Sequence, residues 1–313
     1  MSQVFKPIYL DDLPYPNVLQ PIDIETTLSQ IKTELLNHFD ENHPIHQALT
    51  LESEPVNKVL QVLAYRLSLK VEHINQSARS LMLAFATESD LDHIGVTYYR
   101  LERKLIQAED KTINPPKPAI FESDDDYRYR LALSIEALTR AGSAGSYQFH
   151  ALSASPEVFS VTVHSPAPTE VDVYLAGQVQ GDILAQTGEV GVSSTAIHDV
   201  KNVLTADDIR PLTDLVRVQS ATAKPYQIKA VVYVKNGLSP SLVLAKGLTD
   251  LRAYLSENFK PSNRVATSRI IGALDVSGVS RIELVNPSAD VLVNVGEVAQ
   301  CTVFDIIAKS EGT

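Results

Sequence analysis

The sequence predicts an α+β protein, in which an N-terminal extended arm and long helices are followed by two small α/β modules with mainly antiparallel sheets. Three observations predict this fold class. Apolar residues between positions 24 and 85 recur at helical spacing, a proline-rich run interrupts the chain near position 115, and short helical and strand-like stretches alternate beyond it. With 313 residues, the chain also exceeds what one compact core usually needs, so we expect several units.

Charge is distributed unevenly and restricts the classes of partner. The formal net charge is -11, and residues 1–57 contain nine acidic residues against only Lys6 and Lys32. Such an acidic segment repels phosphate groups and anionic membrane surfaces, so we expect no nucleic acid and no membrane insertion. Other proteins remain as the expected partners.

Cysteine content and hydropathy indicate where the chain is made. Cys301 is the only cysteine, which excludes an intrachain disulfide and a thiolate metal cluster built from this chain alone. The first residues lack the basic start and apolar run of a signal peptide, and no uncharged apolar stretch approaches the ~20 residues that span a bilayer. We therefore expect synthesis in a reducing cytoplasm without an export signal.

The first element is predicted to be an extended acidic arm, residues 1–22, because Pro14, Pro16 and Pro21 prevent a regular helix. Residues 23–112 are predicted to form a helical, bundle-forming region. Its first helix begins after Asp23, a plausible N-cap, and stops before Pro44. The apolar residues that define one face of this helix are Ile24, Leu28, Ile31, Leu35 and Phe39.

The strongest helical signal follows Pro55, where apolar residues are spaced by three or four positions without an intervening glycine or proline. Such a helix would be about 45 Å long, whereas the helix before it is about half as long. The apolar face either packs within its own domain or enters an intermolecular helical bundle, and we favour the bundle. The candidate interaction residues are Val56, Leu60, Leu63, Leu67, Val71, Ile74, Leu81 and Phe85.

Beyond a short helix at Ser89–Val96, residues 113–119 are predicted to be a stiff proline-rich linker. A first α/β module is predicted over 120–206 and a second over 207–313. The first contains two helices after Asp124, strands near 158–163 and 171–175, and a helix at 194–204. The second contains strands at 215–219, 226–234, 279–285 and 298–304, with helices at 241–257 and 268–274.

The two modules also share a pattern. A helix end, a strand, a proline turn and a second strand recur at an offset of 120 to 122 residues, with Leu152, Val161 and Pro166 matching Leu274, Ile282 and Pro287. Both chance convergence and an old duplication explain this echo.

Motifs that could carry chemistry are weak. The acidic triplet at 124–126 suits helix capping better than cation binding, and the three histidines at 38–46 lack the spacing of a zinc site. The glycine-rich run at 142–146 lacks the lysine and the preceding strand of a phosphate loop. Ser146 and His150 lie one helical turn apart without a nucleophile-elbow context. We therefore expect no enzyme, no catalytic residue, no cofactor and no metal.

One charged block in the second module has two interpretations. Asp207 or Asp208 could pair with Arg210 to fix a turn between the modules, which we favour. Alternatively, Arg210 and Asp214 could contact another subunit.

Several blocks are similar to those of one known family, and they are scattered over most of residues 10–300. They are Leu13-Pro14-Tyr15-Pro16, Glu54-Pro55, residues 122–128, residues 141–147 with 150–153, residues 210–214, and residues 278–282 with Asn286-Pro287. With these blocks the sequence resembles the baseplate assembly protein J family of contractile-tailed phages and phage-like particles. The segments 105–119 and 182–189 match none of the blocks.

The resemblance implies a structural wedge component of a contractile tail baseplate. Such a protein assembles into a ring around the central hub and transmits the ring's conformational change during sheath contraction, and residues 115–118 are our candidate pivot. The implied partners are copies of itself, tail protein I-like and lysozyme-like wedge proteins and, indirectly, the spike hub and sheath-proximal proteins. The implied location is a virion or phage-like particle tail baseplate after synthesis in the bacterial cytoplasm. A non-tail adaptor and a tail-associated hydrolase are the alternatives.

Overall fold

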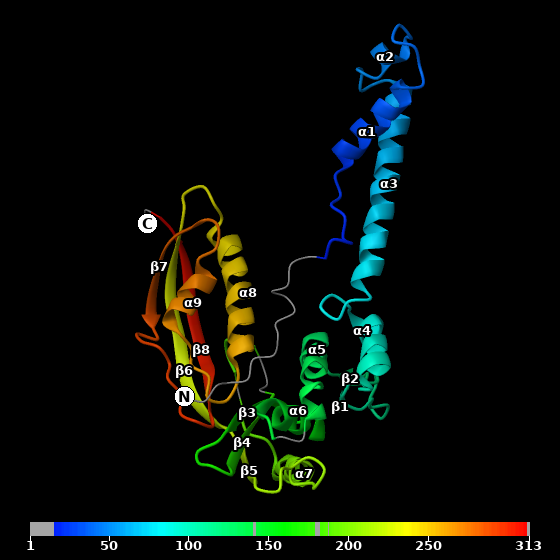
Figure 1. The fold of residues 1–313 in the computed structure, drawn as a ribbon. Coiled ribbons are helices and arrows are strands. Elements are labelled where there is room, and N and C mark those ends of the chain that lie inside the picture. Colours follow the sequence, from blue (N-terminus) through cyan, green and yellow to red (C-terminus); the bar gives the residue numbers. More distant parts are fainter. Residues whose placement is uncertain (1–15, 140–141, 179–181, 187, 312–313) are drawn as a thin grey trace. The chain divides into compact units, whose positions relative to one another are not determined.

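The computed structural model of the chain describes residues 16–139, 142–178, 182–186 and 188–311. The described chain forms two compact units that meet in sequence between Arg103 and Lys104. We call them the N-terminal unit and the C-terminal unit and describe each by itself (Figure 1). Most of the predicted arm, residues 1–15, lies outside the described residues, and residues 16–23 contain a turn but no helix or strand.

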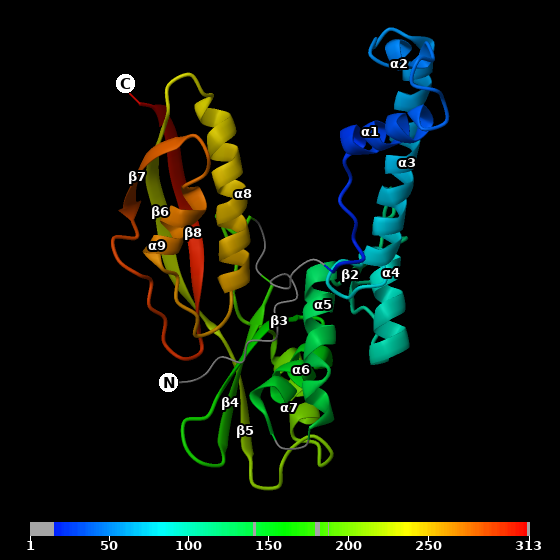
Figure 2. The same cartoon turned by 45° about the horizontal axis from the view of Figure 1, so that its top comes forward.

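The N-terminal unit is helical. It contains α1 (Ile24–Leu36), α2 (Ile45–Ala48), α3 (Pro55–Arg79), α4 (Glu88–Ile94) and a π-helical turn, η2 (Gly95–Tyr99). Asp23 is the N-cap of α1, because its carboxylate accepts hydrogen bonds from the backbone N–H groups of Glu25 and Thr26. In Figures 1 and 2, α1 lies along one part of α3, which is much the longer helix.

The end of α3 differs from the prediction. The apolar pattern predicts a helix to Phe85, but α3 ends at Arg79, so Leu81 and Phe85 lie beyond it. Ser77 and Ser80 donate their hydroxyl groups to the carbonyls of His73 and Ser77, at 2.8 and 3.1 Å. Such bonds compete with the helical ladder, and Leu81 N–H instead bonds the Ala78 carbonyl in a tighter turn.

The C-terminal unit begins with a small hairpin in place of the expected extended linker. Strands β1 (Leu105–Gln107) and β2 (Ile120–Phe121) pair antiparallel, and Asp110 and Lys117 exchange two backbone hydrogen bonds of 3.0 Å between them. Residues 113–119 therefore belong to the closed end of a hairpin. Because both ends of this segment are tied together, it does not supply the free pivot that its prolines suggested.

The first larger sheet has the order β3-β4-β5. Its strands are β3 (Val158–His164), β4 (Glu170–Gly177) and β5 (Leu215–Ser220), with α5 (Asp124–Leu133), the 3-10 turn η3 (Glu136–Leu138), α6 (Ala144–Ala154) and α7 (Ser194–Leu204). β3 and β4 are antiparallel, whereas β4 and β5 are parallel. The prediction grouped the strand at 215–219 with the second module, but this strand completes the first sheet because the crossover through α7 brings it beside β4.

The second sheet has the order β7-β6-β8, with β6 central. Its elements are β6 (Thr222–Val234), α8 (Pro240–Asn258), α9 (Thr267–Leu274), β7 (Val279–Asn286) and β8 (Glu297–Ser310). β7 runs antiparallel and β8 parallel to β6. One face packs against α8 and α9, and the core there includes Ile228, Leu251 and Ile270.

The two sheets are not copies of one hairpin. At the predicted offset, Val291 corresponds to Val171 of β4. Val291 forms only an isolated bridge with Val265, and β7 pairs with β6 rather than with the segment around Val291. This difference favours chance convergence over duplication. Helices with small, mainly antiparallel or mixed sheets confirm the predicted α+β class. Among the described residues, no helix combines the length and the apolar character that a membrane span requires.

Candidate interaction surface

The long helix α3 exposes an apolar face. The α3 stripe comprises Val56, Val59, Leu63, Leu67 and Ile74, which are between 39% and 66% exposed. At 100° per residue these positions fall within about 80° of one another around the helix. Exposed aliphatic residues in such a row are typical of a contact surface rather than of a solvated face.

Only part of the predicted set lies on this stripe. Val56, Leu63, Leu67 and Ile74 do, and Val59 joins them although the sequence analysis missed it. Leu60 is buried and Val71 is half-buried, so they turn toward the chain's own core. Beyond the helix end, Leu81 is exposed and Phe85 is half-buried.

The helix α1 covers only one part of α3. Leu28, Leu49, Leu60 and Ala64 form a buried cluster, with Ile31 and other residues of α1 packed around it. α1 has 13 residues and α3 has 25. At 1.5 Å per residue, α1 spans about 20 Å and α3 about 37 Å, so α1 is too short to cover α3.

Three of the five buried residues of α3 are polar, namely Asn57, Ser68 and Asn75. Asn57 donates to the Leu51 carbonyl at 3.1 Å, and Ser68 donates to the Ala64 carbonyl at 3.0 Å. Asn75 accepts a hydrogen bond from the backbone N–H of Gln20 at 2.9 Å and donates to its carbonyl at 2.8 Å. Hydrogen bonds therefore engage the three polar residues, Leu60 and Ala64 pack in the cluster with α1, and most other aliphatic residues of α3 stay exposed.

A second exposed patch lies elsewhere around α3. Val62, Tyr65 and Leu69 are 60%, 51% and 44% exposed. They sit about 130° around the helix from the α3 stripe. Their spacing of three and four residues was visible in the sequence, but the longer register of the stripe obscured it.

The charge on α3 is mainly basic. Lys58, Arg66 and Lys70 are exposed, whereas Glu72 accepts a hydrogen bond from Arg79 at 3.4 Å. By helical geometry, Lys70 lies within the angular range of the α3 stripe and Arg66 lies at its edge. A partner helix with carboxylates beside its apolar row would complement this surface.

Arg210 and Asp214 form a local hydrogen-bonded contact in the C-terminal unit, which we call the bracket. Arg210 Nη1 donates to the Asp214 carbonyl at 3.0 Å, rather than to the carboxylates of Asp207 or Asp208. Tyr147 on α6 donates its hydroxyl to Asp214 Oδ2 at 2.8 Å, and burial, reinforced by this carboxylate, raises the pKa of Tyr147. The bracket therefore joins α6 to the loop before β5, and a contact with another subunit stays a prediction.

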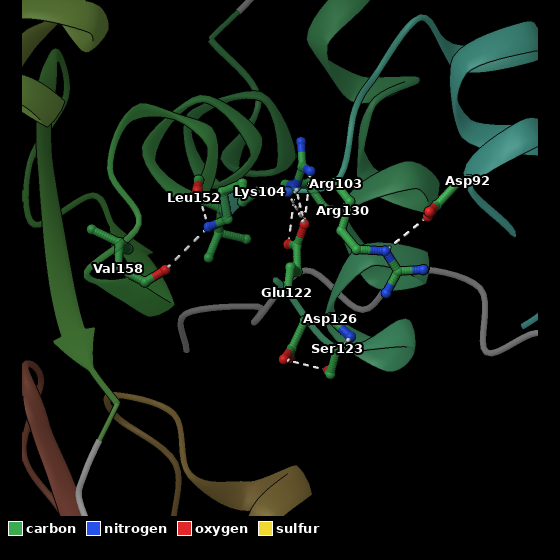
Figure 3. A network of polar contacts seen from close by, with 9 residues as sticks. All are labelled: Asp92, Arg103, Lys104, Glu122, Ser123, Asp126, Arg130, Leu152 and Val158. Atoms are coloured by element: carbon green, nitrogen blue, oxygen red, sulfur yellow. Dashed lines mark hydrogen bonds and ion pairs between the residues drawn. The ribbon is translucent and has the colours of Figure 1, made fainter. Parts of the chain in front are cut away.

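A buried ion pair lies near the first strands of the C-terminal unit, and the sequence analysis did not identify it. Glu122 and Arg130 point toward each other in Figure 3, and both side chains are only 4% exposed. Lys104 donates its side-chain amine to the Leu152 carbonyl at 2.6 Å, and burial lowers its pKa. Because Glu122 and Arg130 bond each other and the Lys104 amine bonds a backbone carbonyl, these described residues have a structural role.

The remaining polar motifs have structural roles. Ser123 caps α5 by accepting a hydrogen bond from Asp126 N–H, and Asp124–Asp126 form the first turn of that helix. The glycine-rich run contains Ser143, the N-cap of α6. Among the residues that the structure describes, no three histidine, cysteine or acidic side chains gather closely enough to hold a metal ion.

Comparison with known proteins identifies the family of the chain. A model described as the Baseplate J-like N-terminal domain matches residues 52–110, which include α3, and one described as the Baseplate J-like protein C-terminal domain matches residues 226–306. The chain is 36% identical over 302 residues to Baseplate protein J of Escherichia phage P2, covering 96% of this chain and 97% of that one. An identity this high across nearly the whole of both chains means that this protein belongs to the baseplate J family.

Proposed function

We propose that the protein is a structural wedge component of a contractile phage tail baseplate. In this proposal it assembles with copies of itself and other wedge proteins into a ring around the central hub and transmits the ring's conformational change during sheath contraction. Family membership supports the coarser role, a structural component of the tail baseplate. The observation that supports the finer role is the α3 stripe, an apolar surface that the described elements of the N-terminal unit leave exposed.

The free energy available from burying the α3 stripe is too small to hold a complex by itself. Fully burying one valine, leucine or isoleucine side chain contributes about 1.5–3 kcal/mol, and the five stripe residues are roughly half exposed. Their burial would therefore contribute about 4–8 kcal/mol, whereas association costs an estimated ~4–15 kcal/mol. A single helix pair would be weak, so stable assembly requires a partner that also covers other surfaces, as expected in a ring with several contacts per subunit.

The charges favour a partner of different sequence on the α3 stripe. If two copies of α3 met along their stripes, Arg66 and Lys70 would bring like charges together. A helix with acidic residues beside its apolar row avoids this repulsion. We therefore infer that the stripe receives a helix of another wedge protein, with the tail protein I-like and lysozyme-like wedge proteins as candidates.

The proposed role is assembly, and we infer no enzymatic activity. Ser146, the serine that the sequence placed one helical turn from His150, is only 2% exposed. A hydroxyl so enclosed has poor access to a substrate, which agrees with a structural role. We expect the protein in the tail baseplate of a virion or phage-like particle.

The proposal is tested by mixing the purified chain with the neighbouring tail proteins and measuring mass by light scattering coupled to chromatography. The double variant Leu63→Glu/Ile74→Glu should stay folded by circular dichroism, because both positions are solvent-exposed, and should fail to form the hetero-oligomer. Leu242→Glu on α8, where the leucine is 73% exposed, is the matched control and should assemble normally. An unchanged hetero-oligomer with the α3 double variant would contradict the proposal.

A further inference from the structure

The strand β8 is a long edge strand of the second sheet. Figure 2 shows β7, β6 and β8 side by side in that order, and the inner edge of β8 pairs with β6 from Glu297 to Ser310. The outer edge is covered at its start, where Gln186 N–H donates to the Cys301 carbonyl at 2.9 Å. From Val303 onward, no other described strand pairs with it.

The backbone groups that face outward can be assigned. Glu311 N–H donates to the Val234 carbonyl of β6 at 2.9 Å, so the backbone groups of Glu311 face inward. Because these groups alternate sides along a strand, those of Ile306 and Ala308 face the outer edge. Such a row of donors and acceptors is a template for another strand.

The side chains alternate in the same way. Phe304, Ile306 and Ala308 pack against the helix-covered core, whereas Val303, Asp305, Ile307 and Lys309 are exposed on the other face. Val303 is 44% exposed and Ile307 is 49% exposed. Within the described residues, neither Asp305 nor Lys309 forms an ion pair, and each flanks Ile307 at two residues' distance.

This symmetrical placement is self-complementary. We propose that β8 pairs antiparallel with β8 of a second copy of the chain, with Ile307 of both copies on the two-fold axis. Asp305 then lies opposite Lys309 of the partner subunit, and the reverse pair forms at the same time. The inference rests on the proposed function for its setting, a baseplate that contains several copies, and adds the surface through which two copies meet.

Charge selects this register over its neighbours. In an antiparallel pair, a shift of two residues one way places Asp305 opposite Ile307 and Lys309 opposite Val303 of the partner strand. A shift the other way places Asp305 opposite Glu311, which is repulsive. Only the register centred on Ile307 pairs both charges with opposite charges.

The other edge of the sheet differs. On β7, Arg281 and Glu283 already form an ion pair with each other at 2.7 Å, and Tyr233 of β6 also donates to Glu283 at 3.2 Å. Its charges are therefore used within the chain. This contrast makes β8 the edge that fits a second copy and makes β7 the natural internal control.

Charge exchange in the purified full-length chain tests the proposal. Asp305→Lys or Lys309→Asp alone would place like charges opposite each other at two symmetry-related positions. A cross-strand pair of opposite charges contributes roughly 0.2–1 kcal/mol, and a like-charge pair is destabilising. Self-association should therefore weaken about tenfold. The double variant Asp305→Lys/Lys309→Asp restores both pairs and should return to within about threefold of the parent. The dissociation constants are measured by sedimentation equilibrium. Unchanged association in the single variants, or a double variant as weak as the singles, would overturn the proposal.

Crosslinking tests the register. In this register Ile307 faces itself in a pair without hydrogen bonds, where Cα atoms are about 4.5 Å apart, a separation that a disulfide accepts. Ile307→Cys in a Cys301→Ala background should form a crosslinked dimer under mild oxidation, whereas Val285→Cys on β7, originally 58% exposed, should not. Equal crosslinking at the two positions would refute the pairing.

The proposals for the α3 stripe and for β8 can be refuted independently of each other. The α3 double variant should still crosslink through Ile307→Cys, because its lesion lies in the N-terminal unit. Conversely, Asp305→Lys should still bind the partner of the α3 stripe. Loss of crosslinking without loss of hetero-oligomer formation would identify β8 as the failing surface of the two.

Discussion

Replacing Glu122 with glutamine would test the buried ion pair of the C-terminal unit. Arg130 donates from Nε to both carboxylate oxygens of Glu122, at 3.1 and 3.3 Å, and from Nη2 to Oε2 at 2.8 Å. Lys104 N–H donates to the same Oε2 at 3.2 Å. The amide keeps the volume of the side chain but removes its charge, so the Arg130 guanidinium stays buried without a counter-charge. Breaking a buried pair in this way costs about 3–5 kcal/mol.

The assay is thermal and urea unfolding followed by circular dichroism. For a unit of this size, roughly 2–4 °C is lost per kcal/mol, so the midpoint of the C-terminal unit should fall by about 6–20 °C. Asp125→Asn on the same helix is the matched control, because Arg128 donates to Asp125 at 2.8 Å while the Asp125 side chain is 94% exposed. That variant should lose less than about 1 kcal/mol. A Glu122→Gln variant as stable as this control would refute the reasoning.

Three further outcomes are expected. Tyr147→Phe should cost about 1.5–3 kcal/mol in urea unfolding, because Asp214 loses its hydroxyl donor. Gly142→Ala should cost about 1–3 kcal/mol in the same assay, because its φ is +70° and a Cβ there would lie 2.7 Å from Pro211 Cγ. Burial lowers the pKa of His150 below 6.5, so the folded state binds fewer protons than the unfolded state as the pH falls below this value. Stability should therefore be complete above about pH 6.5 and fall as the pH drops through the lowered pKa, and His150→Gln should flatten this dependence.

Helices with an amphipathic pattern and clear caps were predictable from the sequence. The helix α7 forms over the predicted residues 194–204, and Ser193 caps it by accepting a hydrogen bond from Ala196 N–H. α3 begins at Pro55 as expected, since proline suits the first turn. Its end was missed because apolar spacing identifies a face but contains no information about hydroxyl groups that compete for the backbone.

Pairings between distant segments were not predictable from local pattern. The proline run at 115–118 suggested a linker, but the strands on either side of it are only three and two residues long and carry little alternation. The placement of β5 beside β4 depends on the crossover through α7 rather than on the composition of β5. The Glu122–Arg130 pair escaped notice for a related reason, because a charged residue in sequence gives no sign that it will be buried.

The candidate surface shows what a periodic pattern can establish. The spacing in α3 located an apolar face, but spacing alone cannot distinguish a face that packs on its own chain from one that binds another protein. The buried residues Asn57, Ser68 and Asn75 support the proposal of a partner, because a helix folded only for its own core would bury its aliphatic residues and expose these polar ones. In α3, Asn57 and Asn75 donate to the carbonyls of Leu51 and Gln20, and most of the aliphatic residues face outward. In the proposed assembly, another molecule buries the exposed stripe, and this burial would offset the cost of leaving aliphatic residues in water.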